Sequence, residues 1–533
     1  MSLQTKVQNK LTIRDSSFPK EWLIPESELP KTTNVIKFIE NSNYLTPEEL
    51  EITGSSALQL LDAIKDHKYT SLTITKAFAH RATIAHQLTN CLTEVFFTEA
   101  FKQAQELDDY YKTTGELKGP LHGLPISLKD EFNIIGQFST IGLVDYIDHD
   151  KLSKDSPNVA ILRQAGAIFY VKTNIPTGVF NNITANSIFG KTVSPFNTNL
   201  ISGGSSGGEA SLVALRGSPL GIGSDMGGSV RQPASLQNLF GFKPSSQRTP
   251  HDTTSIVEGL EAILATNGVL STNFHGLELY IKTIVDSKSW LRNSRVVPIP
   301  WTPIDLSSQK LRFGLLLDDG VIKPSKPVKR ALEKVRESLI NQGYEVIEWQ
   351  KADLIQSIAK FSSFMMSNGC KPLLQALESG KEPTPDFLKT FEDLPSSKLM
   401  DLQYERYQNC NQFWEEWEKL GLDGLISPVS PIAGAPFDGF IDFGYSPLAN
   451  ILDTPAGTFP VLEVDQELDR QGVEGIELRN DMEKAVHQGY DVEKIDGCVV
   501  GLQILGRKLQ EEKTLELIKI VSTKIGTFDY WKK

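Results

Sequence analysis

From about residue 120 onward, short apolar runs alternate with stretches of helical periodicity. The apolar runs predict strands at 124–128, 167–171, 311–317, 344–349, 425–429 and 499–505. Between them, apolar side chains recur every three or four residues over 328–340 and in a last helix that ends near residue 521. Strands that alternate with helices over such a length predict an α/β fold.

The first 120 residues and one late segment have other patterns. Residues 1–45 are polar and interrupted by prolines, which predicts an N-terminal extended arm, and helices are expected at 57–66 and 73–88. The stretch 465–495 is highly charged and poorly periodic, which predicts a solvated insertion. Because no linker rich in Pro, Ser or Gly cuts the chain, residues 46–533 are expected to form one large domain.

Composition narrows the functional classes. The 533 residues contain 54 Lys and Arg against 66 Asp and Glu, a formal net charge of −12, which argues against a nucleic-acid partner. The N-terminus lacks the apolar centre of a signal peptide and no run of 18 apolar residues occurs, so a cytoplasmic protein with no membrane span is expected. The four cysteines are too scattered for a disulfide framework or a zinc site: Cys91, Cys370, Cys410 and Cys498.

Two segments rich in Gly and Ser carry the candidate chemistry. They are S-G-G-S-S-G-G-E at 202–209 and G-I-G-S-D-M-G-G-S-V-R at 221–231. Loops of small residues let consecutive backbone N–H groups point into one concavity, which favours an anion or a developing oxyanion. For a single Gly-Gly pair, a tight turn with close packing is the default interpretation. Two serine-bearing loops so close in sequence favour a functional site.

One catalytic template for these loops is the nucleophile elbow of α/β-hydrolases. The pattern G-x-S-x-G occurs around Ser205 and again around Ser206. An elbow needs a buried strand directly upstream, and the preceding F-N-T-N-L-I-S is too polar for one. It also needs a later histidine, but His251, His275 and His487 have no recognisable setting and are expected to be ordinary surface or core residues.

Two further templates involve lysines. A phosphate loop would end at Gly190-Lys191-Thr192, but Ala185 replaces its first glycine and no strand precedes it, so nucleotide binding is not expected. The other template uses a lysine as the base for a serine nucleophile. Lys129 closes the apolar run L-P-I-S-L, and the two Gly-Ser loops follow it along the chain. An isolated lysine in that position would normally extend to water.

These motifs together resemble the amidase signature family. The resemblance rests on G-P-L-H-G-L-P-I-S-L-K-D at 119–130 and on the two Gly-Ser segments, with supporting matches at 171–174, 189–197 and 241–245. It is strongest over about 119–245, the expected catalytic core. Stretches at 87–91, 106–111, 450–453 and 501–515 are similar to a narrower group, the fungal acetamidases and general amidases. The resemblance implies a single α/β domain whose mixed, twisted central sheet is covered by helices on both sides.

The resemblance also implies three catalytic roles. Lys129 corresponds to the general base, Ser205 to a bridging serine preceded by a cis peptide bond, and Ser229 to the nucleophile that becomes acylated. A lysine can act as a base near neutral pH only if its surroundings lower its pKa. The apolar run that leads into Lys129 offers such surroundings.

Further residues receive supporting roles from the same resemblance. Phe180 is expected to be core packing, while its neighbour Val179 lines the substrate pocket through its backbone. Ser205 also faces the substrate, and Ser206, Asp225 and Arg231 would stiffen the two loops from behind through a hydroxyl and an ion pair. The oxyanion would be held by the backbone N–H groups of Met226, Gly227, Gly228 and Ser229.

Two departures from the family pattern concern the acyl pocket. Gln232 stands where an apolar residue is more usual, and N-G-V-L-S-T-N at 267–273 lacks the usual Gly-Pro step. Neither touches the three catalytic positions, but both put the shape of the acyl pocket in question.

The resulting prediction is an amide hydrolase that converts a small, acetamide-like carboxamide to a carboxylate and ammonia through an acyl-serine. This chemistry needs no metal or organic cofactor, its partner is the small-molecule amide, and a homodimer is compatible with it. One alternative is the glutaminase subunit of a transfer-RNA amidotransferase. Another is a catalytically silent relative that binds a ligand in the same cleft. Ester hydrolysis would be a side activity, because an acyl-serine route also cleaves esters.

Overall fold

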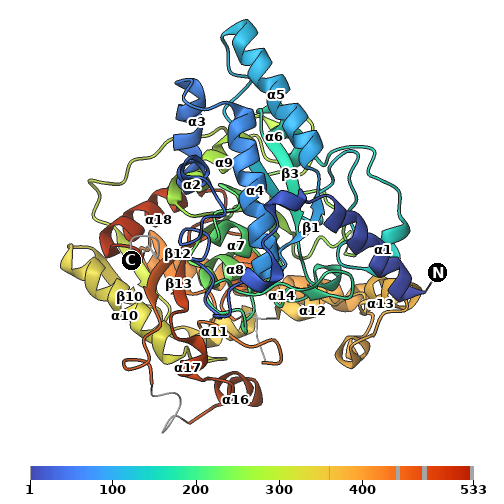
Figure 1. Ribbon diagram of the computed structural model, residues 1–533. Coiled ribbons are helices and arrows are strands. Elements are labelled where there is room, and N and C mark those ends of the chain that lie inside the picture. The colour runs from blue at the N-terminus through green and yellow to red at the C-terminus, as the bar shows by residue number, and fades with distance from the viewer. Residues whose placement is uncertain (1, 258, 359, 440–443, 471–476, 529–533) are drawn as a thin grey trace.

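A computed structural model describes residues 2–257, 259–358, 360–439, 444–470 and 477–528. Through them runs an eleven-stranded sheet in the order β1-β3-β2-β6-β8-β7-β12-β13-β11-β9-β10 (Figure 1). The strands are β1 (Leu92–Val95), β2 (Pro125–Lys129), β3 (Ile168–Thr173), β6 (Gly221–Asp225), β7 (Phe240–Lys243), β8 (Thr266–Ser271), β9 (Arg312–Leu315), β10 (Glu345–Glu348), β11 (Gly424–Pro428), β12 (Ala456–Glu463) and β13 (Val499–Leu505). A separate hairpin pairs β4 (Ala185–Asn186) with β5 (Gly190–Lys191).

The sheet is mixed, as predicted. Strands β3, β2 and β6 are parallel to one another, and so are β10, β9 and β11. The strands between these two groups pair antiparallel, and so does β1 with β3. Because β2 and β6 are parallel neighbours, their carboxyl ends meet at one edge, where open α/β sheets commonly place their ligands.

Helices flank this sheet and fill the connections. They are α1 (Leu3–Ser16), α2 (Pro47–Gly54), α3 (Ala57–Lys65), α4 (Ser71–Thr89), α5 (Phe97–Thr114), α6 (Pro157–Gln164), α7 (Gly207–Ala214), α8 (Arg231–Leu236), α9 (Phe274–Asp286), α10 (Lys326–Asn341), α11 (Ala352–Ile358), α12 (Phe361–Met365), α13 (Lys371–Gly380), α14 (Ser396–Leu420), α15 (Leu448–Ile451), α16 (Asp481–Gln488), α17 (Val492–Ile495) and α18 (Glu511–Ile525). Short 3₁₀ turns are η1 (Lys20–Trp22), η2 (Glu26–Glu28), η3 (Val144–Asp148), η4 (Thr177–Val179), η5 (Ser289–Leu291) and η6 (Asp386–Thr390). Among the described residues, no helix combines the length and the apolar character needed to cross a bilayer.

Local sequence explains where several helices begin. At α2 the hydroxyl of Thr46 accepts from the backbone N–H of Glu49, and the Glu49 carboxylate accepts from the backbone N–H of Thr46. Ser56 and Gln59 form the same reciprocal pair at α3. Each pair satisfies two N–H groups, one of them an otherwise unpaired donor of the first helical turn.

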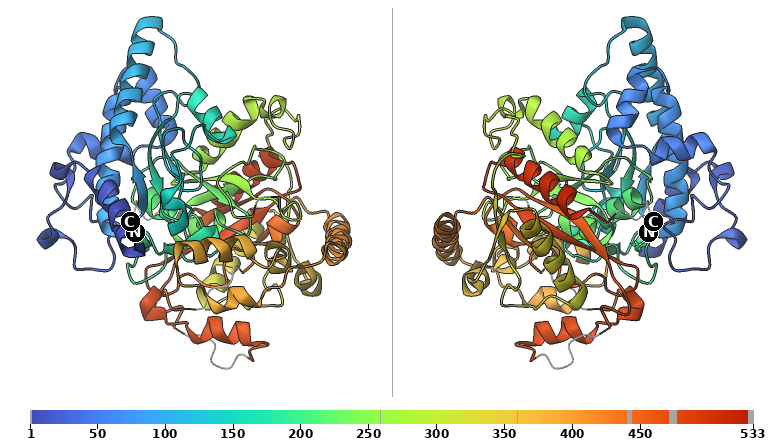
Figure 2. Two further views of the ribbon diagram at one scale, coloured as in Figure 1. Left: turned by 90° about the vertical axis from the view of Figure 1, so that its right-hand side faces the viewer. Right: turned by 90° about the vertical axis from the view of Figure 1, so that its left-hand side faces the viewer.

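The apolar core lies on both faces of the sheet. Ile504 of β13 belongs to a large cluster with Phe459, whereas the next residue, Leu505, belongs to a second cluster with Phe413 and Trp417. Neighbouring residues of a strand point to opposite faces, so the two clusters are the two faces of one sheet. Figure 2 shows the N-terminal helices, in blue, gathered along one side of this body, and an orange helix seen end-on at the opposite side.

The strands and helices expected between 120 and 521 are present, but residues 1–45 differ from the expected extended arm. Residues 3–16 form helix α1, whose buried residues are Lys10 and Arg14. Lys10 forms an ion pair with Glu94, and Arg14 donates to the carbonyl of Leu92 on β1. The apolar residues Leu3, Val7 and Leu11 of α1 also pack against the cluster of Val144, Ile188 and Phe189. Their spacing of four residues is typical of a helix, but they are few and stand among polar residues, so the pattern was not recognised.

The charged segment 465–495 also differs from a fully solvated insertion; its residues 471–476 lie outside the described residues. The described part contains α16 and α17, at the lower edge of Figure 1. Asp469 is buried against Arg330, with a shortest N–O distance of 2.6 Å, and Glu483 is buried against Arg479 at 2.8 Å. Some charged side chains of the segment 465–495 are therefore buried in ion pairs that stabilise the fold.

Candidate active site

Lys129 is the last residue of β2, and its side chain is completely buried. The four preceding strand residues are also buried, so the strand carries the amine into the interior at the carboxyl edge of the sheet. The amine nitrogen Nζ lies 2.7 Å from Ser205 Oγ, 2.8 Å from Ser224 Oγ and 3.1 Å from Glu131 Oε1. The predicted base and the predicted bridging serine are therefore in direct contact.

The surroundings of Lys129 change its acidity. Burial lowers the pKa of its ammonium below the ordinary value, because the charged form loses its hydration. The carboxylate of Glu131, and more weakly those of Asp225 and Glu209, act in the opposite direction. Burial has the larger effect, so the neutral amine is favoured relative to a lysine in water.

Ser205 lies in the first Gly-Ser loop, directly before α7. The peptide bond between Gly204 and Ser205 is cis, as the resemblance implies. Gly203 has φ +84°, and a Cβ atom there would lie 2.7 Å from the Cα of Pro233. Only glycine fits that conformation and that close approach, so the loop lies tightly against α8.

Ser229 lies in the second loop, between β6 and α8. It is 8% exposed and lines a cavity, whereas Ser205 is fully buried. The carbonyl of Ser229 accepts from the backbone N–H of Ser206 at 3.1 Å, which joins the two loops directly. Of the two serines, Ser229 is the more accessible to a molecule in the cavity.

The backbone donors of the second loop differ from the expectation at one position. The N–H of Gly228 donates to Asp225 Oδ1 at 2.8 Å, so this donor is occupied inside the protein. For Met226, Gly227 and Ser229, the described residues provide no acceptor for the backbone N–H. The expected set of four oxyanion donors is thereby reduced to three.

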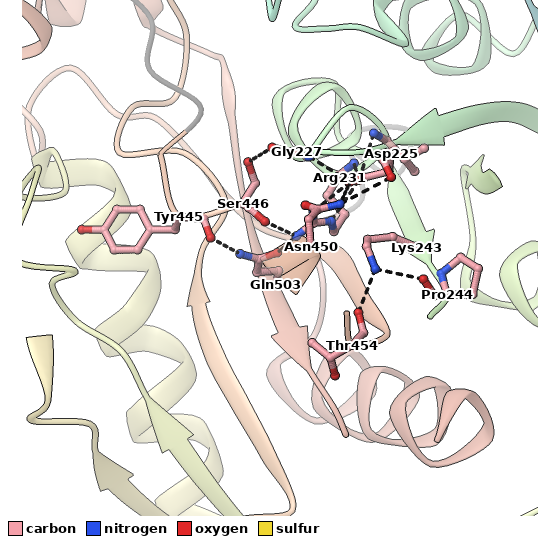
Figure 3. A network of polar contacts seen from close by, with 12 residues as sticks. Asp225, Gly227, Arg231, Lys243, Pro244, Tyr445, Ser446, Asn450, Thr454 and Gln503 are labelled. Atoms are coloured by element: carbon pink, nitrogen blue, oxygen red, sulfur yellow. Dashed lines mark hydrogen bonds and ion pairs between the residues drawn. The ribbon is translucent and has the colours of Figure 1, made fainter. Parts of the chain in front are cut away.

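Behind this loop, Asp225 and Arg231 form the expected ion pair, and both are fully buried (Figure 3). Burial alone would raise the pKa of Asp225, but the guanidinium of Arg231 lowers it far below its ordinary value. Arg231 also donates to the carbonyl of Ser446, to Gln503 Oε1 and to Asn450 Oδ1, at 2.7–2.8 Å. The loop is therefore connected to the last part of the chain.

Ser206 supports the loops in a different way from the expected one. Its hydroxyl is buried without a hydrogen-bond partner among the described residues, and a Cβ at Gly223 would lie 2.5 Å from that oxygen. The contact between the loops is the backbone hydrogen bond from Ser206 to Ser229. The hydroxyl therefore packs against β6 and does not bridge the loops.

The cavity in front of Ser229 has a volume of about 490 Å³. Ser205, Ser224 and Ser229 line it, together with residues 251–253, Ser255 and residues 293–295. Val179 and Phe180 also line it, so Phe180 is more than core packing. Val179 has φ +66°, an unfavourable conformation for a β-branched residue, and it lines the cavity at the end of η4.

The two departures from the family pattern are not among the residues that line the cavity within the described part of the chain. Gln232 is buried in α8, where its backbone N–H donates to the carbonyl of Gly228. Asn267 acts indirectly, because its Oδ1 lies 2.6 Å from Nδ1 of His251, which does line the cavity. The other histidines, His275 and His487, do not line this cavity.

Sequence reasoning missed three residues near Lys129. Ser224 precedes Asp225 on β6, and Glu131 follows Lys129 by two positions; each contacts the amine. Glu209 is buried on α7 and accepts from Ser127 and Thr173 at 2.5 and 2.7 Å. The period-two alternation of a strand could have placed Ser224, but the turn after β2 gives no comparable signal for Glu131.

Within the described residues, no group of three or more His, Cys, Asp or Glu side chains is arranged to hold a metal ion. The polar groups that converge on Lys129 are hydroxyls and carboxylates. Such a set can accept, donate and relay protons.

Comparison with known proteins gives one family. The family model described as Amidase matches residues 73–515. The chain is 34% identical to an acetamidase of Aspergillus oryzae, over 96% of this chain and 97% of that protein. It is 33% identical to an acetamidase of Emericella nidulans, over 96% of each. Among solved structures, a fatty acid amide hydrolase superposes with a TM-score of 0.91 at 31% identity, covering 99% of this chain and 96% of the other.

Proposed function

The chain belongs to the amidase signature family and is an amide hydrolase, and from this premise we propose that it hydrolyses small carboxamides through an acyl-Ser229 intermediate. The products would be a carboxylate and ammonia. The observation that carries the mechanism is the contact of the buried Lys129 amine with Ser205, beside a cavity that Ser229 lines.

Burial matters because a solvated lysine would be nearly useless as a base. With an ordinary pKa of about 10.4, only about one molecule in 2,500 is neutral at pH 7, a handicap of roughly 4.6 kcal/mol. The lowered pKa of Lys129 reduces that handicap. The neutral amine takes the proton of Ser205, which takes that of Ser229 as the Ser229 oxygen attacks the amide carbon.

The remaining steps return the same proton. The negative carbonyl oxygen of the tetrahedral intermediate accepts hydrogen bonds from the free N–H groups of Met226, Gly227 and Ser229. The protonated lysine gives its proton back through Ser205 to the amide nitrogen, the carbon–nitrogen bond breaks, and ammonia leaves. Water then attacks the acyl-Ser229 ester, with the same relay accepting its proton, and releases the carboxylate.

A short acyl group is supported by the relatives named acetamidase. The cavity favours a second candidate, an amide with a longer acyl chain. Its volume of about 490 Å³ is within the range of drug-sized ligand sites. A water molecule takes about 30 Å³ of liquid, so acetamide, only a few times larger, would leave most of the cavity empty.

Ammonia release from acetamide, propionamide, benzamide, a long-chain amide and glutamine tests the substrate class. We expect a short amide to have the highest kcat/KM, and hydroxylamine to divert the acyl group to a hydroxamate. Highest kcat/KM with the long-chain amide would select the second candidate. Glutamine hydrolysis only with partner subunits would select the amidotransferase subunit, and no turnover of any amide would select a silent relative.

Ser229→Ala tests the nucleophile. We expect it to abolish both ammonia release and hydroxamate formation while the protein stays folded. Ser235→Ala is the matched control, because this buried serine on α8 donates to the carbonyl of Gln232 and lies outside the proposed relay. Full activity of Ser229→Ala would reject the acyl-serine route.

We propose a cytoplasmic setting without a nucleic-acid partner, supported by the acidic composition and the free cysteines of the described chain. The proposed partner is the amide itself, and a homodimer stays a prediction.

A further inference from the structure

Glu131 is a buried carboxylate in the substrate cavity for which the mechanism above has no use. It follows β2 by two residues, its side chain is 6% exposed, and it lines the same cavity as Ser229. Its Oε1 lies 3.1 Å from Nζ of Lys129. A buried charge of this kind is costly unless it is paired, so its placement beside the proposed base needs an explanation.

The contacts of Lys129 suggest an explanation for the position of Glu131. A neutral amine has two N–H bonds and one lone pair, and Nζ has three polar neighbours. An ionised carboxylate can only accept, so Glu131 Oε1 faces an N–H bond of the amine. At 3.1 Å the two groups form an ion pair without hydrogen-bond geometry, and Oε1 has no hydrogen-bond partner within the described residues. The hydroxyl of Ser224 can accept the other, at 2.8 Å. The lone pair is then left for the third neighbour, the hydroxyl of Ser205, whose proton it must receive.

The other acidic groups near this pair are engaged elsewhere. From α7, Glu209 accepts the hydroxyls of Ser127 and Thr173. From β6, Asp225 is paired with Arg231.

Two basic groups approach from other elements. Lys172 of β3 pairs with Asp130, with an N–O distance of 3.9 Å, and its Nζ donates to the carbonyl of Phe138. His251, from the segment after β7, has Nδ1 beside Asn267. Among the charged side chains of the described chain, Glu131 is therefore the one in direct contact with the amine of Lys129.

We propose that Glu131 is a positioning residue that directs the lone pair of Lys129 toward Ser205 and sets the pH at which this amine gives up its proton. The proposal rests on the function proposed above. Burial alone would make Lys129 a weak base, and a carboxylate 3.1 Å away restores part of its basicity. The carboxylate of Glu131 thus favours the protonated form of Lys129, whereas burial favours its neutral form.

The test is the pH dependence of kcat/KM for the preferred amide, in the full-length wild type and in Glu131→Gln. Gln keeps an acceptor of the same size but removes the charge. Loss of an opposite charge at this distance changes a pKa by about 1–3 units, so the acidic midpoint should move to lower pH by about that amount. An unchanged midpoint in the folded variant overturns the proposal.

Glu131→Asp tests the position of the charge and also serves if Glu131→Gln does not fold. It withdraws the carboxylate by one methylene, so we expect a smaller shift in the same direction and a lower plateau of kcat/KM. No shift in a folded Glu131→Asp, with Glu131→Gln unfolded, also overturns the proposal. Glu382→Gln is the matched control, because Glu382 is also buried but accepts from the backbone N–H of Val144. The acidic midpoint of kcat/KM in this variant should equal that of the wild type.

Failure of the proposed function would look different. If Ser229→Ala retains amide hydrolysis, the acyl-serine mechanism fails whatever Glu131 does. If Ser229→Ala is inactive and the Glu131 variants have the wild-type midpoint, only the role of Glu131 is rejected.

Discussion

Arg231 binds Asp225 through two nitrogens, with Nε 3.0 Å and Nη2 2.9 Å from the two carboxylate oxygens. Both side chains are fully buried, and Asp225 also accepts from the N–H of Gly228. One carboxylate therefore neutralises a buried guanidinium and shapes the loop that carries Ser229.

Asp225→Asn should be strongly destabilising. Removing one partner of a buried ion pair typically costs about 3–5 kcal/mol, and loop distortion should also lower kcat. Thermal unfolding and ammonia release measure the two effects. Asp286→Asn is the control, since its partner Lys282 and Asp286 itself are about half exposed, and such surface pairs contribute at most about 1 kcal/mol. Equal losses in the two variants would contradict this role of Asp225.

The same pair predicts acid sensitivity. The folded-state pKa of Asp225 is depressed, so its contribution to stability is complete above its ordinary pKa of about 3.9 and is lost as pH falls below that value. The melting temperature of the wild type should therefore fall below about pH 4 more steeply than that of Asp225→Asn. Parallel curves would show that this carboxylate does not control acid unfolding.

Gly228→Ala should reduce kcat through backbone geometry alone. Gly228 has φ +119°, and a Cβ there would lie 2.1 Å from Ser446 Oγ. Displacing the neighbouring oxyanion donors should cost on the order of 10²–10³-fold in kcat. Gly115→Ala is the control, because Gly115 also has positive φ, at +71°, but a Cβ would meet nothing within 4 Å. Near-normal kcat in Gly228→Ala would show that this loop tolerates movement.

Lys129→Met should remove the base while it preserves an apolar side chain of similar length. We expect kcat/KM to fall by about 10²–10⁴-fold, with an unchanged fold by circular dichroism. In the wild type, activity should fall as pH drops below the lowered pKa of Lys129, because the amine becomes protonated. A variant with wild-type kcat/KM and the same acidic limb would exclude Lys129 as the titrating base.

Glu209→Gln should remove a pH dependence of stability. Burial raises the pKa of Glu209 to about 8, so between its ordinary value of 4.5 and about 8 the folded chain holds a proton that the unfolded chain releases. Stability from this group is complete at low pH and is lost as pH rises through that window. Melting temperatures from about pH 5 to pH 9 should fall less for Glu209→Gln than for the wild type, and equal slopes would contradict this.

Much of the architecture could be predicted from local pattern. The apolar runs at 124–128 and 499–505 became β2 and β13, and the Gly-Ser motifs identified the loops of Ser205 and Ser229. The sequence did not reveal that the N–H of Gly228, one of the proposed oxyanion donors, donates to the carboxylate of Asp225 three residues earlier. That contact depends on φ and ψ angles, which residue type alone leaves open.

Long-range contacts were beyond prediction from one sequence. Ser446 and Gln503 bond to Arg231, although more than 200 residues separate them from it along the chain. Gln503 stands in the run predicted as a strand over 499–505, and Ser446 stands in none of the predicted elements. Neither pattern indicates a distant arginine as the partner. Helix α1 was missed for a related reason, since its buried Lys10 looks like an ordinary solvated lysine in sequence.

The bonds from Arg231 to Ser446, Asn450 and Gln503 also set an order of events during protein synthesis. A nascent chain emerges from its N-terminus, so β2, both serine loops and α8 are made long before these three partners. Until the partners arrive, the loop of Ser229 lacks the contacts that hold it in shape. The loop that carries Ser229 should therefore reach its final shape only after the segment 446–503 has been synthesised.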